Sequence, residues 1–125
     1  MNAAKAAADK TYSPYSSYPV GAAVLAEDGR IFAGCNVENA SYGGTICAER
    51  TAYVKAVSEG ARRFAAVAVF CKKAHDCWPC GLCRQFMSEF GVDIDVVVEG
   101  ADGSLKSLKL GELLPRHFGP DDLPK

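Results

Sequence analysis

Short apolar segments alternate along this chain with segments of helical pattern, and this alternation limits the folds that it can adopt. The runs VGAAVLA (20–26), FAAVAVFC (64–71) and DIDVVVEG (93–100) are almost wholly apolar over the length of a strand, as expected of strands covered on both faces. The segments ICAERTAYVKAVSEG (46–60) and CGLCRQFMSEF (80–90) predict helices that end at glycines. Buried strands between helices predict an α/β fold, an αβα sandwich around one sheet.

The connections between the strands predict their directions. The turn EDGR leads from 20–26 into a second strand, IFAGCNVE (31–38), which predicts an antiparallel hairpin. Only the turn ADGS separates 93–100 from LKSLKL (105–110), whereas a parallel crossover needs roughly a dozen residues or more. The fourth and fifth strands should therefore be antiparallel, in a mixed five-stranded sheet. GELLPRHF (111–118) predicts a short terminal helix, and we expect one domain over 1–125.

Charge and hydropathy disfavour several classes of partner. The net charge is −1 and the 14 basic residues are scattered, so we expect no nucleic-acid partner. No apolar run approaches the roughly eighteen residues of a membrane span, so we expect no membrane partner. The N-terminal MNAAKAAADK (1–10) has the pattern of an alanine-rich polar helix and lacks the apolar region of a secretory signal. We therefore expect a cytoplasmic protein.

Cysteines form the most distinctive motif. In a reducing compartment, six cysteines favour metal binding or reactivity over disulfides. Cys80 and Cys83 lie at i and i+3 in the first turn of a predicted helix and so share one face, while Cys47 begins the other predicted helix. Three thiolates around zinc leave one tetrahedral position open, as in catalytic rather than structural sites. The spacing predicts one zinc per chain, held by Cys47, Cys80 and Cys83.

Spacing alone leaves two alternatives open. CWPC (77–80) or CGLC (80–83) could be a redox pair, and a fourth thiolate from Cys77 would make a structural zinc site. Cys77 lies in the loop before Pro79, where the chain is held extended, and should not share the helical face of the other two cysteines. We interpret Cys77 as a bystander. We interpret Cys35 and Cys71, inside predicted strands, as small apolar packing residues.

Glu49 and Arg50 follow the first of the three predicted ligands. Glu49 lies two residues from Cys47, so it should not bind the same ion but should lie close to the open position. A carboxylate there can accept a proton from water and return it to a substrate; the alternative is a solvated glutamate favoured by the helix dipole. Arg50 falls on a predicted apolar stripe of Ile46, Arg50, Tyr53, Val54 and Val57. There it would donate to the thiolates, unless it is a surface arginine.

These motifs resemble those of a known family. CAER (47–50) followed by PCGLCRQ (79–85) is similar to the signature of zinc-dependent nucleoside and nucleic-acid deaminases. The segment 12–52, YSPYSSYPVGAAVLAEDGRIFAGCNVENASYGGTICAERTA, resembles the N-terminal half of the small homotetrameric cytidine deaminases. ELLPRHF (112–118) resembles their C-terminal segment. The resemblance covers nearly the whole chain and implies the cytidine-deaminase fold.

The resemblance implies hydrolytic deamination of cytidine and 2′-deoxycytidine to uridine and 2′-deoxyuridine with release of ammonia, a step of pyrimidine salvage. Glu49 matches the residue that carries a proton to N3 and then to the leaving amino group. Arg50 and Gln85 match residues that donate hydrogen bonds to the ligand cysteines. The zinc ligands of the family match Cys47, Cys80 and Cys83.

Substrate contacts also follow from the resemblance. Asn36 and Glu38 match the pair that holds the ribose 3′-hydroxyl, and the backbone of Ala48 matches a contact to the base carbonyl. Tyr18 falls where the family usually has a phenylalanine that stacks on the pyrimidine, and tyrosine keeps the aromatic face. Trp78 replaces a serine or threonine, which leaves the substrate range open.

The resemblance further implies a homotetramer with shared active sites. In the tetrameric relatives, the residue matching Phe118 packs over the pyrimidine in a neighbour's site, and the residue matching Tyr42 contacts a neighbour's ribose. A deaminase of a modified cytosine nucleoside, of the blasticidin type, and a non-catalytic zinc or redox module remain as alternatives. A polynucleotide deaminase is disfavoured because its fifth strand is parallel and the ADGS turn is too short for that connection.

Overall fold

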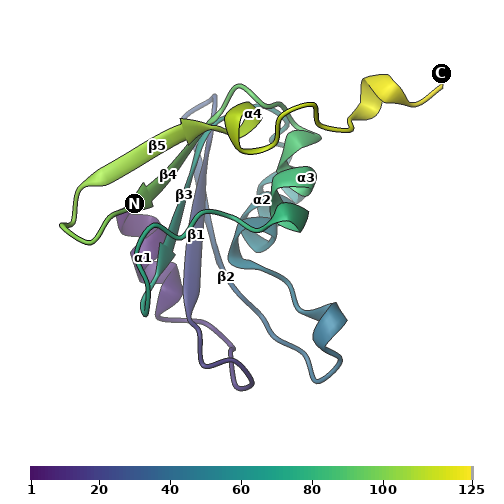
Figure 1. Ribbon diagram of the computed structural model, residues 1–125. Helices are drawn as coiled ribbons and strands as arrows, with labels where there is room; N and C mark the ends of the chain where they lie inside the picture. The colour runs from purple at the N-terminus through teal and green to yellow at the C-terminus, as the bar shows by residue number, and fades with distance from the viewer. Residues whose placement is uncertain (125) are drawn as a thin grey trace.

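The computed structural model describes residues 1–124 (Figure 1). One five-stranded sheet has the order β2-β1-β3-β4-β5. Its strands are β1 (Val20–Ala26), β2 (Ile31–Cys35), β3 (Phe64–Cys71), β4 (Asp95–Glu99) and β5 (Leu105–Lys109). The helices are α1 (Asn2–Ala8), α2 (Ala48–Ser58), α3 (Gly81–Ser88) and α4 (Leu110–Leu113), with 3-10 turns η1 (Tyr42–Gly44) and η2 (Pro120–Asp122). Over these residues, no helix combines the length and the apolar character that a membrane span requires.

The strand directions agree with those predicted from the connections. β1 pairs antiparallel with both β2 and β3, and β4 pairs antiparallel with β5. Only β3 and β4 are parallel, and the chain between them carries α3. The turn before β5 is tight because Gly103 adopts a positive φ of 82°. The mixed sheet with an antiparallel last pair is thereby confirmed.

Helices cover both faces of the sheet (Figure 1). On one face, α1 packs through Ala4 against Ala23 and Ala68. It lies so close that a Cβ on Gly21 would be 1.9 Å from the carbonyl oxygen of Ala4. On the other face, α2 and α3 cover the larger core, whose strand residues are mostly valine and alanine. The two layers of helix make the predicted αβα sandwich.

The buried face of α2 differs from the predicted apolar stripe. Ile46 precedes the helix and is 38% exposed, and Val54 is 48% exposed. The buried residues of the helix are instead Ala48, Glu49, Ala52, Tyr53 and Ala56. Alanines allow the backbone of α2 to approach β1 and β2 closely. Because alanine is only weakly hydrophobic, a search for a stripe of large apolar residues does not identify this face.

The terminal helix is shorter than predicted. α4 ends at Leu113 instead of continuing to 118. Leu114 precedes Pro115, and the residue before a proline is disfavoured in helical conformation. Arg116 has a positive φ of 53°, which also interrupts a helix. The segment after α4 consequently runs away from the sheet (Figure 1).

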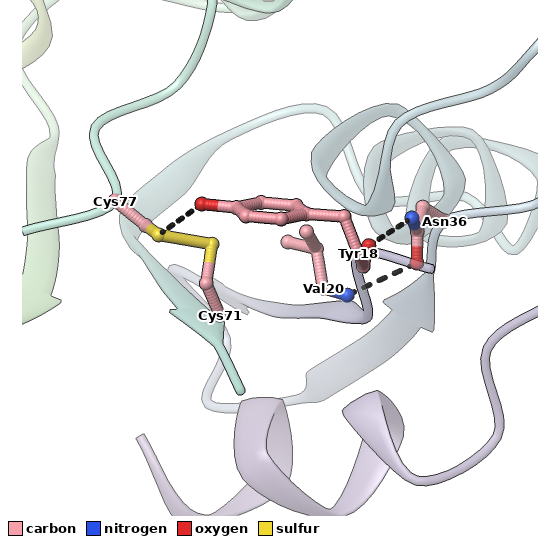
Figure 2. Close-up of a disulfide and its surroundings, with 5 residues drawn as sticks. All are labelled: Tyr18, Val20, Asn36, Cys71 and Cys77. Carbon is pink, nitrogen blue, oxygen red and sulfur yellow. Dashed lines mark hydrogen bonds between the residues drawn. A yellow bond between two sulfur atoms is a disulfide. The ribbon is translucent and has the colours of Figure 1, made fainter. Parts of the chain in front are cut away.

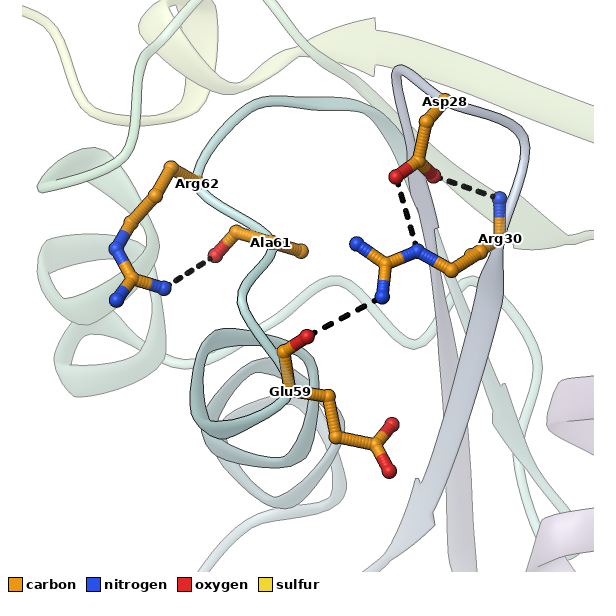
Figure 3. Close-up of polar contacts among 5 residues, drawn as sticks. All are labelled: Asp28, Arg30, Glu59, Ala61 and Arg62. Carbon is orange, nitrogen blue, oxygen red and sulfur yellow. Dashed lines mark hydrogen bonds and ion pairs between the residues drawn. The ribbon is translucent and has the colours of Figure 1, made fainter.

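A set of arginine contacts joins the C-terminal end of α2 to the β1–β2 turn (Figure 3). Arg30 Nε donates to Asp28 Oδ2 at 2.9 Å, and its Nη1 donates to the carbonyl oxygen of Glu59 at 3.2 Å. Arg62 Nη1 donates to the carbonyl oxygens of Ala61 and Val57 at 2.9 and 2.7 Å. The Arg30 bond links the β1–β2 turn to the residue that follows α2, and the Arg62 bonds add contacts at the same helix end.

Tyr53 carries a polar atom in the middle of this core. Its side chain is fully buried, and within residues 1–124 its hydroxyl has no hydrogen-bond partner. Burial raises the pKa of this phenol. We expect Tyr53→Phe to increase the free energy of unfolding by about 1 kcal/mol, because it removes an unsatisfied buried group and keeps the ring. Thermal unfolding of both proteins checks this; a lower melting temperature for Tyr53→Phe would contradict it.

Candidate active site

The three cysteines predicted as ligands lie together at the starts of two helices. Cys47 is the N-cap of α2, Cys80 is the N-cap of α3, and Cys83 lies in the first turn of α3. Their sulfur atoms are all within 4.8 Å of one another. Both N-terminal helix ends therefore present backbone N–H groups and a partial positive charge to the same cluster, which stabilises thiolates.

This cluster fits a tetrahedral zinc ion. Sulfur ligands lie about 2.3 Å from zinc, which puts two of them about 3.8 Å apart, so the observed separations need little closing. The hydrogen bond with the Cys83 thiol, and then Arg50, lower the pKa of Cys47. The same bond between the thiols, and then burial, raise the pKa of Cys83. Cys83 is buried and Cys80 is exposed, so one side of the cluster is open to the cavity described below.

Glu49 is buried beside this cluster. Only 4% of the residue is exposed, so the alternative of a solvated helix-end glutamate is wrong. Burial, and next the negative charge of Cys47, raise the pKa of the Glu49 carboxyl above its ordinary value. A carboxyl with a raised pKa can take up and release protons near neutral pH.

Arg50 lies half-buried on the other side of Cys47. Its Nη2 donates to Cys47 Sγ at 3.6 Å and to the carbonyl oxygen of Thr45 at 3.2 Å. The guanidinium thus lies next to the thiolate rather than out in solvent, and its charge offsets part of the negative charge of three thiolates. The second bond fixes the segment just before Cys47 to the same side chain.

A cavity of about 540 Å³ opens in front of the cysteines. Cys47, Cys80, Glu49 and Ala48 line it at the helix starts, and Trp78 lines it from the loop before α3. Its remaining lining comes from the loop before β1 and the start of β1, from the chain between β2 and α2, and from the end of β3 and the loop after it. This volume is within the range of pockets that bind small molecules.

Asn36 and Glu38 line the part of the cavity formed by the chain after β2. Asn36 is buried; its Nδ2 donates to the carbonyl oxygen of Tyr18 at 2.8 Å, and its Oδ1 accepts from Val20 N at 3.0 Å. Glu38 Oε1 accepts from the backbone N–H groups of Tyr15 and Ser16 at 2.9 and 3.1 Å, and Oε2 accepts from the Ser16 hydroxyl. The Ser16 hydroxyl bond, and then the backbone bonds, lower the pKa of Glu38.

A disulfide between Cys71 and Cys77 contradicts the prediction for both residues. Their Cα atoms are 6.2 Å apart across a sequence separation of 6. β3 ends at Cys71, and the loop after it turns back with Asp76 at a positive φ of 53°. Asp76 N donates to the carbonyl oxygen of Glu99 at 3.0 Å, and Lys106 pairs with its carboxylate at 2.8 Å. These contacts return Cys77 to the end of the strand, so it is neither a bystander nor a zinc ligand.

Gln85 points away from its predicted partners. Its Nε2 donates to the carbonyl oxygen of Phe118 at 2.7 Å. The amide is therefore used to attach the C-terminal segment to α3, and the expected bond to a ligand sulfur is not among the contacts of residues 1–124. The motif predicted a residue type near the cysteines, but the side-chain direction depended on where the terminal segment packs.

Tyr42 and Phe118 are both outside the lining of this chain's own cavity in the described residues. Tyr42 is 74% exposed and packs against Tyr15 with ring centroids 5.6 Å apart. Phe118 is 57% exposed on the segment that runs away from the sheet (Figure 1). Two large exposed aromatic side chains at separate places are available to a partner.

The family model for the cytidine and deoxycytidylate deaminase zinc-binding region matches residues 1–99. That segment includes the whole cysteine cluster and Glu49. The chain belongs to this deaminase family. Zinc is accordingly the metal of the family, and the cysteine cluster is placed to bind it.

Named relatives of this deaminase share nearly its full length. A cytidine deaminase of Sporosarcina psychrophila is 47% identical over 120 residues, which is 95% of this chain and 88% of the relative. A probable cytidine deaminase of Dictyostelium discoideum is 48% identical, covering 98% of this chain and 84% of the relative. The crystal structure of a cytidine deaminase from Burkholderia pseudomallei has a TM-score of 0.89 at 48% identity, covering 94% of this chain and 95% of that one.

Some lining residues of this deaminase were not predicted from its sequence. Thr45 and His75 line the cavity from loops, and the two disulfide cysteines line it from β3 and the loop that follows. Isolated loop residues carry no periodicity that would mark them. For the cysteines, a sequence separation of 6 does not fix the distance between their Cα atoms, so the sequence carried no decisive signal for the disulfide.

Proposed function

We propose that this protein is a zinc-dependent cytidine deaminase that hydrolyses cytidine and 2′-deoxycytidine to uridine and 2′-deoxyuridine with release of ammonia. The observation that carries the proposal is a buried carboxyl, Glu49, next to a three-cysteine cluster at the base of a cavity large enough for a nucleoside. Cys47, Cys80 and Cys83 hold one zinc per chain. When bound, zinc supplies a nucleophile by lowering the pKa of a water molecule.

Glu49 is the acid–base residue of this proposal. It accepts a proton from the attacking water, delivers it to N3 of the pyrimidine, and then protonates the amino group that leaves as ammonia. Burial supports this role because the raised pKa brings the protonated and ionised forms closer in free energy. The net reaction consumes one water and exchanges the amino group at C4 for oxygen.

Substrate binding is assigned to the cavity lining. Tyr18 stacks on the pyrimidine, the backbone of Ala48 contacts the base carbonyl, and Asn36 and Glu38 bind the ribose 3′-hydroxyl. The hydrogen bonds from the Ser16 hydroxyl and two backbone N–H groups keep Glu38 ionised and fixed, which suits an acceptor of a hydroxyl proton. Arg50 is not assigned a contact with the substrate; it donates a hydrogen bond to the ligand Cys47.

The deaminase is proposed to act as a homotetramer with shared active sites. The exposure of Tyr42 and Phe118, outside their own cavity, supports this assembly. Phe118 would cover the pyrimidine of a neighbouring subunit, and Tyr42 would contact a neighbour's ribose. Gln85 takes part indirectly, because its bond to the Phe118 carbonyl holds the segment that presents the ring.

Mixed tetramers test the shared site. Phe118→Ala and Glu49→Gln homotetramers should both have low activity, because one lacks the aromatic cover and the other lacks the acid–base residue. Refolding the two variants together should give activity above the mean of the parents, because some sites then combine an intact Glu49 with an intact Phe118 from another chain. Activity equal to that mean would show that each chain completes its own site.

Release of ammonia from cytidine tests the function itself. The zinc-loaded protein should convert cytidine to uridine, followed by the fall in ultraviolet absorbance, and should release one ammonia per cytidine. A non-catalytic zinc or redox module would release none. A panel containing deoxycytidine and modified cytosine nucleosides separates the proposed activity from a blasticidin-type deaminase. We further propose that the protein is a single-domain enzyme of pyrimidine salvage that acts in the cytoplasm, with neither nucleic acid nor membrane as partner.

A further inference from the structure

The disulfide lies in the wall of the cavity, next to the side chain proposed to stack on the substrate. Cys71 and Cys77 both line the cavity; Cys71 is buried at the end of β3, and Cys77 is half-buried. The hydroxyl of Tyr18 is directed at Cys77 Sγ, one of the two sulfur atoms of the disulfide (Figure 2). The disulfide therefore forms part of the surface that a bound nucleoside would meet.

Tyr18 is held both at its backbone carbonyl and at its side-chain hydroxyl. Its carbonyl oxygen accepts a bond from Asn36 Nδ2 at 2.8 Å, and its hydroxyl lies 3.5 Å from Cys77 Sγ. A sulfur atom in a disulfide has no proton, so the tyrosine hydroxyl is the donor. The contact fixes the far end of the side chain of a residue that is 39% exposed.

The same disulfide restrains the loop that leads to the metal cluster. Cys77 is followed by Trp78, which lines the cavity, and then by Pro79 and the ligand Cys80. With the disulfide formed, this loop is tied covalently to the rigid end of β3. Trp78, which follows Cys77 directly, and Tyr18, whose hydroxyl contacts Cys77 Sγ, are then both restrained through Cys77.

We propose that the Cys71–Cys77 disulfide is a redox-sensitive positioning element of the nucleoside pocket, which acts on substrate binding through the Tyr18 hydroxyl and the Trp78 loop. The predicted effect of the disulfide on cytidine binding rests on the proposed deaminase function. Disulfides of cytosolic proteins are usually transient and redox-responsive rather than permanent, which suits a pair placed beside a pocket. Reduction separates the sulfurs and leaves the Tyr18 hydroxyl without a fixed partner. The loop then loses its covalent attachment to β3 and is held only by the contacts of Asp76 with Glu99 and Lys106.

The redox step balances with a low-molecular-weight disulfide such as glutathione disulfide as oxidant. The Cys77 thiolate, which the cavity makes accessible, attacks one sulfur of glutathione disulfide and expels one glutathione thiolate. The Cys71 thiolate then attacks the Cys77 sulfur and expels the second. Two protein thiols lose two electrons and two protons, and one glutathione disulfide becomes two glutathione thiols; reduction by glutathione runs the same steps in reverse.

The experiment compares the zinc-loaded protein equilibrated with glutathione disulfide and with glutathione. Alkylation after denaturation counts free thiols by mass, and zinc content is measured in each sample. We expect two fewer alkylated cysteines in the oxidised protein, equal zinc, and a KM for cytidine about three- to tenfold higher in the reduced protein, as for one lost hydrogen bond. The change should fall on KM rather than kcat, because Glu49 and the ligands are untouched.

Trp78 gives a readout that does not depend on deamination. It is the single tryptophan of the chain and follows Cys77 directly, so its fluorescence should change on reduction. If fluorescence responds and no state releases ammonia from cytidine, the proposed function fails and the redox element stands. Six alkylated cysteines after treatment with glutathione disulfide, or equal KM values in the two states, would overturn the proposal.

Variants separate positioning from general stabilisation. Cys77→Ser should show the higher KM and an unchanging fluorescence in both buffers. Tyr18→Phe should still form the disulfide but show a smaller ratio of reduced to oxidised KM than the unaltered chain; an unchanged ratio would remove the hydroxyl from the proposal. Cys35→Ser is the matched control, since Cys35 is a free cysteine on β2 outside the cavity lining, and its redox response should be that of the unaltered chain.

Discussion

Glu49→Gln should lower kcat for cytidine by about 10²–10⁴-fold, while zinc content stays at one per chain. Glutamine fills nearly the same volume, so the buried site beside the cysteine cluster keeps its packing. It carries no proton that can be transferred, and the proposed reaction needs this one side chain for protonation of N3 and of the leaving amino group. The effect should therefore be at the upper part of that range. Steady-state kinetics with metal analysis on the same sample measures it.

Glu59→Gln is the matched control for this variant. Glu59 follows the same helix, α2, at its exposed C-terminal end, where its carbonyl oxygen accepts from Arg30. The same chemical change there should leave kcat within about twofold, because surface substitutions rarely alter a distant site. Near-normal turnover by zinc-loaded Glu49→Gln would show that Glu49 has a structural role and is not the acid–base residue.

Cys80→Ala should abolish both metal binding and activity. The variant removes one of three protein ligands, and the two remaining thiolates leave the ion with half of its tetrahedral positions to solvent. Metal analysis after dialysis should show well under one zinc per chain, and deamination should fall to background. Cys80 is exposed, so the substitution creates no cavity in the core and the fold should persist.

Cys77→Ala and Cys35→Ala are the controls for ligand loss. Cys77 is bonded to Cys71, and Cys35 lies on β2 with its thiol directed at the Lys10 carbonyl oxygen at 3.4 Å. Both variants should keep one zinc per chain. Loss of zinc from Cys77→Ala would indicate a four-thiolate structural site and contradict the catalytic assignment.

The layered fold followed from local features of the sequence. Valine-rich strands buried on both faces and the ADGS turn before β5 each carry a signal within a few residues, because strand burial and tight turns depend on adjacent side chains. The face of α2 was predicted less well. Its buried residues are largely alanines, whose contribution depends on how closely the helix approaches the sheet.

The cluster of Cys47, Cys80 and Cys83 was predictable because all three lie at the N-cap or in the first turn of two helices that follow strands, and such helix starts gather at one edge of the sheet. The direction of Gln85 was not predictable. Its amide donates to the Phe118 carbonyl oxygen, so its direction depends on where the C-terminal segment packs.

By itself, then, the sequence determined the αβα sandwich, the metal-binding cysteines and the carboxyl beside them, because periodicity, turn length and helix-start spacing are local properties. Only the tertiary structure decided that Glu49 is buried, that Cys71 is bonded to Cys77, and that Tyr18 lies against that bond. The burial of Glu49 and the position of Tyr18 depend on segments far apart in the chain being packed to within contact distance. Cys71 and Cys77 are only six residues apart, but the loop between them is folded back by the contacts of Asp76 with Glu99 and Lys106. The position of a side chain relative to such a neighbour is set by the whole fold, and no short stretch of residues encodes it.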